Sequence, residues 1–327
     1  MPKISSSTPL SNSRNPLSKN MLSLRRSALE TCFKFMGNKE FIISVRERAW
    51  IKDVFRSESD FLSKKDLSNI DLSHMNFAHL DLTGTNMSGA DLRLAKLKGA
   101  VLVKAKFNDA NLCGANLIGA NLEGANFHNS NLSFANFGNA NLAMANISNA
   151  NISNATLSNA NLCASDLSNS DMQGAILYNA NLCDANLKKA SLSAASLNRA
   201  NLEYAYFEKS DLSKADLEDA IFNETDFKRA DLSGAILKGA NLDDLCFKKA
   251  RLHGANLNGV SAGNANFSGA YLKDADLSNA DFNGAYFKSA NLNNANIKNS
   301  NLSESDLRDA DLTDADLSGA DLSDCRI

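Results

Sequence analysis

Every fifth residue of this chain is apolar from Leu67 to Ile327, an uninterrupted run of 53 positions. These central positions hold 35 Leu, 11 Phe, 4 Ile, 2 Met and one Ala. Alanine occupies 38 of the 53 positions that lie two residues earlier, and Asn or Asp occupies 37 of the 53 positions in between. Each repeat therefore reads Ala-(Asn/Asp)-(Leu/Phe)-x-x, as in residues 115–119.

A period of five fits neither a helix nor a flat strand. Five helical steps turn about 140° net, which would spread the leucines around the axis. On a flat strand an odd spacing would place successive leucines on opposite faces. The chain must instead bend once per repeat, which makes a coiled solenoid with Leu, Phe and Ala inside. Proline is absent from residues 17–327, as a ladder of backbone hydrogen bonds requires.

The repeat closely resembles that of the pentapeptide-repeat family over Leu67–Ile327, about four fifths of the chain. The resemblance implies an all-β solenoid, a right-handed quadrilateral β-helix with four pentapeptides in each coil. It also implies that the central residue and the Ala point inward and that the other three residues point outward.

The central phenylalanines test the number of sides. In a 20-residue coil, seven of the 11 share one column, namely Phe107, Phe127, Phe207, Phe227, Phe247, Phe267 and Phe287. In a three-sided coil of 15 residues they would split five, four and two. Because stacked rings gain offset contacts along the axis, the four-sided coil is favoured. About 13 such coils, at a strand spacing of ~4.8 Å, predict a rod roughly 60 Å long.

The first 60 residues differ in composition from the repeats. Residues 1–20 contain six serines and three prolines, which predicts a disordered leader. Residues 21–60 contain two helix-like patterns, Met21–Met36 and Lys39–Phe55, which predict a helical cap over the first coil. The predicted domains are therefore 1–20, 21–60 and 61–327. The basic, serine-rich leader is interpreted either as a secretion or transit signal or as a tail without a signal.

One repeat breaks the core pattern, because Ala262 stands where its column neighbours are Leu242 and Phe282. Val260, in the neighbouring small position, partly refills the space. Two interpretations remain: a repacked core, which volume-conserving changes permit, or a soft and bendable coil.

No motif for catalysis or cofactor binding is present. The four histidines fall in different columns or distant coils, no Cys/His cluster has zinc spacing, and phosphate-binding and nucleophile motifs are absent. We therefore expect no enzyme activity, no cofactor and no metal.

Cys163 and Cys183 lie one coil apart, within disulfide range, but the unpaired set of six cysteines favours free thiols in a reducing compartment.

Charge is distributed unevenly although the net charge is only −3. This balance argues against direct nucleic-acid binding, and no apolar run is long enough for a transmembrane helix. On the phenylalanine side the outward positions form a basic stripe, the candidate partner-binding residues Lys188, Lys189, Lys209, Lys228, Arg229, Lys248 and Lys249, interrupted by Glu208. The preceding side carries an acidic stripe, Asp184, Glu203, Glu224, Asp243 and Asp244. Either the basic stripe is a binding face, or exposed positions simply tolerate any residue.

The C-terminal segment 301–327 contains eight acids against two arginines, and the repeat continues to the last residue. A β-helix that ends there exposes unpaired backbone groups beside a candidate dimer edge of Leu312, Leu317, Leu322 and Ile327. We therefore expect a weak homodimer through the last coils. Quinolone-resistance members of the family dimerise through C-terminal coils and present an acidic rod that mimics DNA to gyrase.

Two functions follow from these observations. The first is a non-enzymatic interaction rod or scaffold for an unidentified protein partner, in one version a bacterial effector secreted into a host cell. The alternative is a DNA-mimicking modulator of a topoisomerase such as gyrase, which the basic stripe and the long N-terminal region argue against. The expected location is a reducing one, either the bacterial cytoplasm or, for an effector, the host cell.

Overall fold

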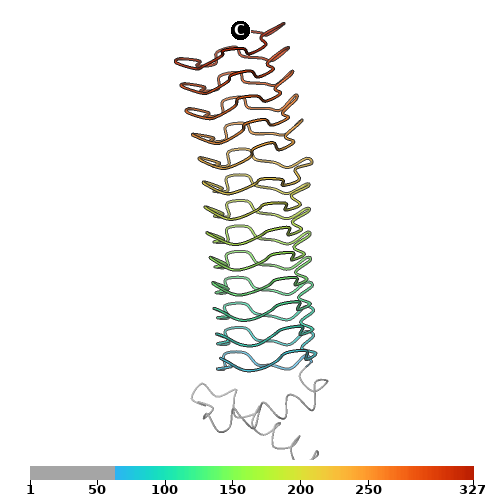
Figure 1. Ribbon diagram of the computed structural model, residues 1–327. Helices are drawn as coiled ribbons and strands as arrows, with labels where there is room; N and C mark the ends of the chain where they lie inside the picture. The colour runs from blue at the N-terminus through green and yellow to red at the C-terminus, as the bar shows by residue number, and fades with distance from the viewer. Residues whose placement is uncertain (1–62) are drawn as a thin grey trace, which may run out of the picture. The chain divides into compact units, whose positions relative to one another are not determined.

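The computed structural model describes residues 63–327, which form one column of stacked coils (Figure 1). Parallel β-bridges join residues that are 20 positions apart, from Asp66–Asn86 at one end to Asp306–Arg326 at the other. Each bridge stands alone, so the sides of the column contain no strand longer than one bridged residue within the described range. Each coil therefore has four sides of five residues, as the phenylalanine pattern predicts.

In a typical repeat with Asn or Asp before the central residue, all five backbone N–H groups have acceptors. Three donate to neighbouring coils, one closes the turn, and one donates to the Asn or Asp side chain in an Asx turn. In one repeat the bonds are Leu117 N–H to Asn136 O (2.7 Å), Ile118 N–H to Asn116 Oδ1 (3.1 Å), Gly119 N–H to Gly138 O (2.9 Å), Ala120 N–H to Leu117 O (3.0 Å) and Asn121 N–H to Ala100 O (2.9 Å). The Asn/Asp preference therefore has a backbone cause.

The corners of the coil require left-handed backbone. Within residues 63–327, positive φ occurs in 39 non-glycine residues and 14 glycines, which, from Asn69 on, all lie two positions after a central residue. This is the third position of a β-turn of the type II kind, which favours Gly and Asn. Bulky residues such as Leu94, Phe134 and Tyr204 also adopt it, at a cost of about 1 kcal/mol each. The hydrogen bonds of the coil hold these residues in place and point their side chains outward.

The central residues fill the interior from Leu67 to Leu307, where each is buried. Phe227 stacks on Phe207 and on Phe247, with ring centroids 5.1 Å apart in both pairs. Phe267 continues the stack, with centroids 4.9 Å from Phe247 and 5.1 Å from Phe287. These contacts confirm the 20-residue register.

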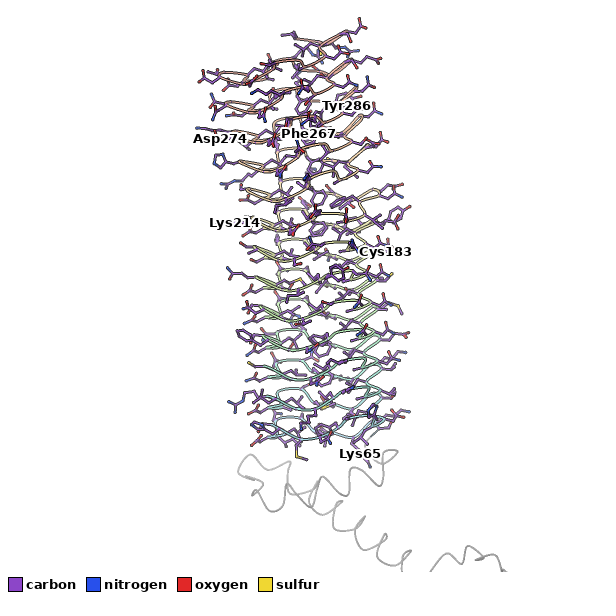
Figure 2. The ribbon with its side chains drawn as sticks, in the orientation of Figure 1. Lys65, Cys183, Lys214, Phe267, Asp274 and Tyr286 are labelled. Atoms are coloured by element: carbon purple, nitrogen blue, oxygen red, sulfur yellow. The ribbon has the colours of Figure 1, made fainter. Side chains whose placement is uncertain are left out.

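We number the four sides by their central residues. Side 1 contains Phe247 and the central residues 20 positions apart from it; sides 2, 3 and 4 contain Leu252, Leu257 and Ala262 in the same way. Sides 2 and 4 are opposite faces of the column. In Figure 2, Lys214 and Asp274 of side 2 lie at one edge of the column and Cys183 of side 4 lies on the other half.

The ladder remains intact at the alanine that breaks the core pattern. Ser261, next to Ala262, forms bridges to both neighbouring coils, and Ala262 is fully buried. These bridges support a repacked core there. Among the described residues the ladder is instead interrupted one coil earlier, because Ile221 forms a bridge to Asn201 but none to Asn241.

The predictions for the N-terminal region lie outside the described residues. They concern the leader 1–20, the helical cap 21–60 and residues 61–62 of the repeat region. Within residues 63–327 the structure contains no helix long and apolar enough to cross a membrane.

The phenylalanine stack predicts a graded response to substitution at Phe247, whose ring lies between Phe227 and Phe267. We expect Phe247→Ala to lower the free energy of unfolding by about 3–5 kcal/mol, because it removes the buried ring and leaves a cavity. Phe247→Leu should cost about 1 kcal/mol, because leucine already occupies this column at Leu187. Denaturant unfolding followed by circular dichroism measures both, and equal losses would contradict the stacking argument.

Candidate partner-binding faces

The predicted basic stripe lies on side 1 and is exposed along its whole length. Four of its residues occupy left-handed corner positions, and three occupy the turn position just before a corner. The exposed side chains are Lys188, Lys189, Lys209, Lys228, Arg229, Lys248 and Lys249. The fold therefore brings all seven candidate residues to one side within four successive coils.

Two contacts shape the lower part of this stripe. The Lys188 ammonium lies 5.2 Å from the centroid of the Tyr206 ring, in a cation–π arrangement. Lys209 Nζ lies 3.6 Å from Glu208 Oε1, so the one acid of the stripe is paired within it. Both pairs are exposed and add little to stability. The positive charge of the stripe is most concentrated in its two upper coils, which carry Lys228, Arg229, Lys248 and Lys249 and no acid in the stripe positions.

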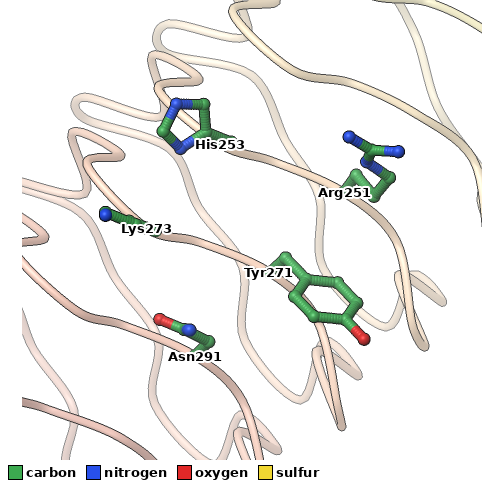
Figure 3. A pocket seen from close by; sticks show the side chains of 5 residues that line it. All are labelled: Arg251, His253, Tyr271, Lys273 and Asn291. Carbon is green, nitrogen blue, oxygen red and sulfur yellow. The ribbon is translucent and has the colours of Figure 1, made fainter.

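The basic surface continues around the corner onto side 2. Lys249 is followed two residues later by Arg251, which begins a groove of about 450 Å³. Figure 3 shows the side chains that line it, drawn from successive coils: Arg251, His253, Tyr271, Lys273 and Asn291. The groove combines cationic groups, an aromatic ring and an amide, and no carboxylate lines it.

Two carboxylates flank the groove and partly balance its charge. Asp231 Oδ2 lies 3.4 Å from Arg251 Nε, and Asp274 Oδ2 lies 3.6 Å from His253 Nδ1. Sequence reasoning missed the groove because Arg251 and Tyr271 occupy positions where most repeats have Asn or Asp. The signal that could have found them is the replacement of the Asx residue in two successive coils of one side.

The acidic stripe lies on side 4, where the ladder is interrupted. The gap at Ile221 and Asn241 opens into a cavity of about 430 Å³ lined by Glu203, Asp243 and Asp244 among others. Side 4 precedes side 1 in each coil, so the acidic and basic stripes run beside each other along the column. The two stripes carry opposite charge. A partner that binds across both would therefore need acidic groups facing side 1 and basic groups facing side 4.

Side 4 also carries the pair of cysteines that lie one coil apart. Cys163 and Cys183 are half-buried free thiols, and Cys183 Sγ lies 3.6 Å from Asp184 Oδ2. Burial, with the Asp184 carboxylate second, raises the pKa of Cys183 to about 11. This thiol is therefore protonated at neutral pH, which does not suit a nucleophile.

The C-terminal edge is open within the described chain. The central residues lose their cover progressively, with Leu312 and Leu317 half-buried, Leu322 37% exposed and Ile327 84% exposed. These are the four residues of the predicted dimer edge. One coil before the end, Arg308 donates two short hydrogen bonds to the Asp306 carboxylate, at 2.8 and 2.6 Å.

The sequence matches the family model of pentapeptide repeats in eight copies over most of the described column. The matched ranges are residues 66–102, 105–142, 145–182, 175–213, 210–248, 250–289 and 290–327. No curated protein matches the chain.

Several solved structures are similar. HetL, a pentapeptide repeat protein involved in heterocyst differentiation regulation from the cyanobacterium Nostoc sp. strain PCC 7120, is 28% identical, with 82% of this chain and 95% of HetL covered and a TM-score of 0.23. A trypsin-treated form of QnrB1, a plasmid-mediated fluoroquinolone resistance protein, is 21% identical, with 50% of this chain and 85% of the QnrB1 chain covered and a TM-score of 0.40. Rfr23, a pentapeptide repeat protein from the cyanobacterium Cyanothece 51142, is 27% identical, with 40% of this chain and 63% of the Rfr23 chain covered and a TM-score of 0.16.

The acids near the C-terminal edge predict a stability that depends on pH. The Arg308 hydrogen bonds lower the pKa of Asp306 to about 2, and Ser318 with Lys298 lowers that of Asp316 to about 2. Because these folded-state values lie below the unfolded value of about 3.9, their stabilisation is present above pH ~4 and is lost as the pH falls through ~2. We expect hydrogen exchange of the last coils to accelerate over that interval.

The matched variant is the double substitution Asp306→Asn and Asp316→Asn, which keeps an acceptor for the Asx turn and removes the titrating groups. Its exchange rates should change less between pH 4 and pH 2 than those of the wild type, after correction for intrinsic exchange. Identical pH profiles for the two proteins would show that these carboxylates do not stabilise the edge.

Proposed function

The chain belongs to the pentapeptide-repeat family, and on this basis we propose that it is an interaction rod that binds an acidic surface of a protein partner. Members of the family fold as right-handed quadrilateral β-helices and are generally structural or interaction proteins rather than enzymes. The observation that carries the proposal is the continuous basic surface formed by the stripe on side 1 and the groove on side 2.

The geometry of the coil supports such a role. The stripe places charged side chains at intervals of about 4.8 Å, the spacing of neighbouring strands, over four successive coils. The backbone under these side chains is fixed on every coil by inter-coil hydrogen bonds. A partner with a row of carboxylates at a similar spacing would therefore meet a pre-organised surface and lose little entropy in ordering it.

A finer version of the proposal is a bacterial effector that acts on a host protein. The leader supports it, because residues 1–29 contain five basic residues and no acid. In this version the protein is made in the bacterial cytoplasm and is translocated into the host cell. Fusing residues 1–29 to a reporter enzyme and measuring the reporter in host cytosol tests this step separately from partner binding.

The alternative function is a DNA-mimicking modulator of a topoisomerase such as gyrase. The acids of residues 301–327 favour it, because a mimic presents negative charge along a rod. The exposed basic stripe weighs against it, because it would repel the positively charged DNA-binding surface of such an enzyme. A gyrase supercoiling assay with the purified chain discriminates between the two functions.

Charge reversal tests the basic surface directly. We expect the triple variant Lys228→Glu, Arg229→Glu and Lys248→Glu to abolish capture of the partner and to leave the circular dichroism spectrum unchanged, because all three side chains are exposed. Partners captured by the intact chain, identified by mass spectrometry, provide the readout.

The matched control changes the same amount of charge elsewhere. Lys96, Lys98 and Lys104 are exposed on sides 3 and 4, away from the stripe, and their reversal to Glu should leave capture intact. Equal capture by the stripe variant and the wild type would mean that the stripe is only a solvated surface. Equal loss in both triple variants would mean that net charge, and not the stripe, determines binding.

We further propose a weak homodimer through the last coils. A two-fold end-to-end contact would bury Leu317, Leu322 and Ile327 and leave the acids at the rim, where salt screens their repulsion. Sedimentation should therefore show association that increases with protein concentration and with ionic strength. A monomer under every condition, or a dimer unchanged by deletion of residues 306–327, would refute the contact.

A further inference from the structure

Three metal-ligating side chains come together on side 4. Cys163, Cys183 and Asp184 each offer one ligand atom, and these three atoms lie within 4.8 Å of one another. The two thiols come from the same turn position of successive coils, and the carboxylate follows Cys183 at the left-handed corner. Figure 2 places Cys183 at the surface of the column, where an ion has access from solvent.

The distances are close to those of a tetrahedral site. With Zn–S bonds of ~2.3 Å and a Zn–O bond of ~2.0 Å, a sulfur and an oxygen ligand should lie roughly 3.5 Å apart and two sulfurs about 3.8 Å apart. Cys183 Sγ and Asp184 Oδ2 are already 3.6 Å apart. Both cysteines are half-buried, and the ladder fixes their backbones one coil apart. Small changes in side-chain torsion would therefore be enough to bring the three ligand atoms to these distances.

The surroundings of the triad favour a cation. The residue that follows Cys183 by one coil is Glu203, and the acidic stripe continues from there along the same side. The other described cysteines lack such a grouping, because none of them has a second thiol in the same position of a neighbouring coil: these are Cys113, Cys246 and Cys325. The triad therefore differs from the rest of the cysteine set in both geometry and charge.

We propose that Cys163, Cys183 and Asp184 form a binding site for a thiophilic divalent cation, zinc being the best match, that links two successive coils. Two thiolates and one carboxylate suit Zn²⁺, and the fourth coordination position is left for water or for a ligand from a partner. On binding, each thiol releases its proton to solvent and no oxidant or reductant is needed. The sequence analysis placed the two cysteines one coil apart but did not combine them with the Asp184 carboxylate, and it therefore expected no metal.

The test uses the full-length, fully reduced chain with Co²⁺ as a spectroscopic probe and Zn²⁺ as competitor. We expect one equivalent of Co²⁺ to produce thiolate-to-metal charge-transfer absorption, and one equivalent of Zn²⁺ to remove it. Cys163→Ser and Cys183→Ser should each abolish the absorption, and Asp184→Asn should weaken Co²⁺ binding at least tenfold. Cys113→Ser and Cys246→Ser are matched controls that keep the triad and should bind like the wild type.

Stability provides a second readout. Zn²⁺ should raise the unfolding temperature of the wild type and of Cys113→Ser, and should leave that of Cys183→Ser unchanged. Absence of charge-transfer absorption in the reduced wild type would overturn the proposal, as would equal binding by Cys183→Ser. One combined result would assign the pair to a disulfide instead. In it, the air-exposed wild type has a mass lower by two hydrogens, Cys183→Ser does not, and the wild type binds no metal after reduction.

Discussion

The hydrogen bonding of the backbone N–H groups is the constraint on which this fold depends. A bend every five residues would leave polar groups unpaired in a less regular chain, because turns interrupt ladders. Here one side chain, the Asn or Asp before the central residue, accepts the N–H that the coils cannot reach, as Asn116 does for Ile118. Every position of the repeat then donates a hydrogen bond. This explains both the absence of proline from the repeats and the absence of insertions, since either would shift all later bonds out of register.

Once the backbone and the two inward positions are fixed, the outward positions are free to serve recognition. The basic stripe shows this freedom, because Lys228 and Lys248 occupy the same position of successive coils. At a separation of about 5 Å, two like charges in water repel by roughly 1 kcal/mol, which the ladder and the phenylalanine stack readily offset. A partner carboxylate placed between them would remove this repulsion, so part of the driving force for binding is already present in the free protein.

The sequence predicted the coil well because both the five-residue repeat and the 20-residue spacing of the phenylalanines can be read from it directly. Phe207, Phe227 and Phe247 define the register by spacing alone, and the stripe follows from it. The position of the ladder gap could not be predicted, because side-chain volume pointed to Ala262 whereas hydrogen bonding fails at Ile221. The groove, and the position of Asp184 beside the cysteine pair, were missed for a related reason. They depend on which way side chains turn from neighbouring coils, and a count of residue types along one side does not contain that information.

The proposed basic surface and the proposed metal site lie around a filled interior, and this arrangement limits how they can influence each other. Between side 2 and side 4 the core is closed by buried rings such as Phe227 and Phe247. A close-packed interior leaves its side chains little room to shift when an ion binds at the surface. Any coupling would instead be electrostatic and local, because Asp184 of the metal site belongs to the acidic stripe, which runs beside the basic stripe that begins at Lys188. Such coupling should weaken as the ionic strength rises, since salt screens interactions between exposed charges.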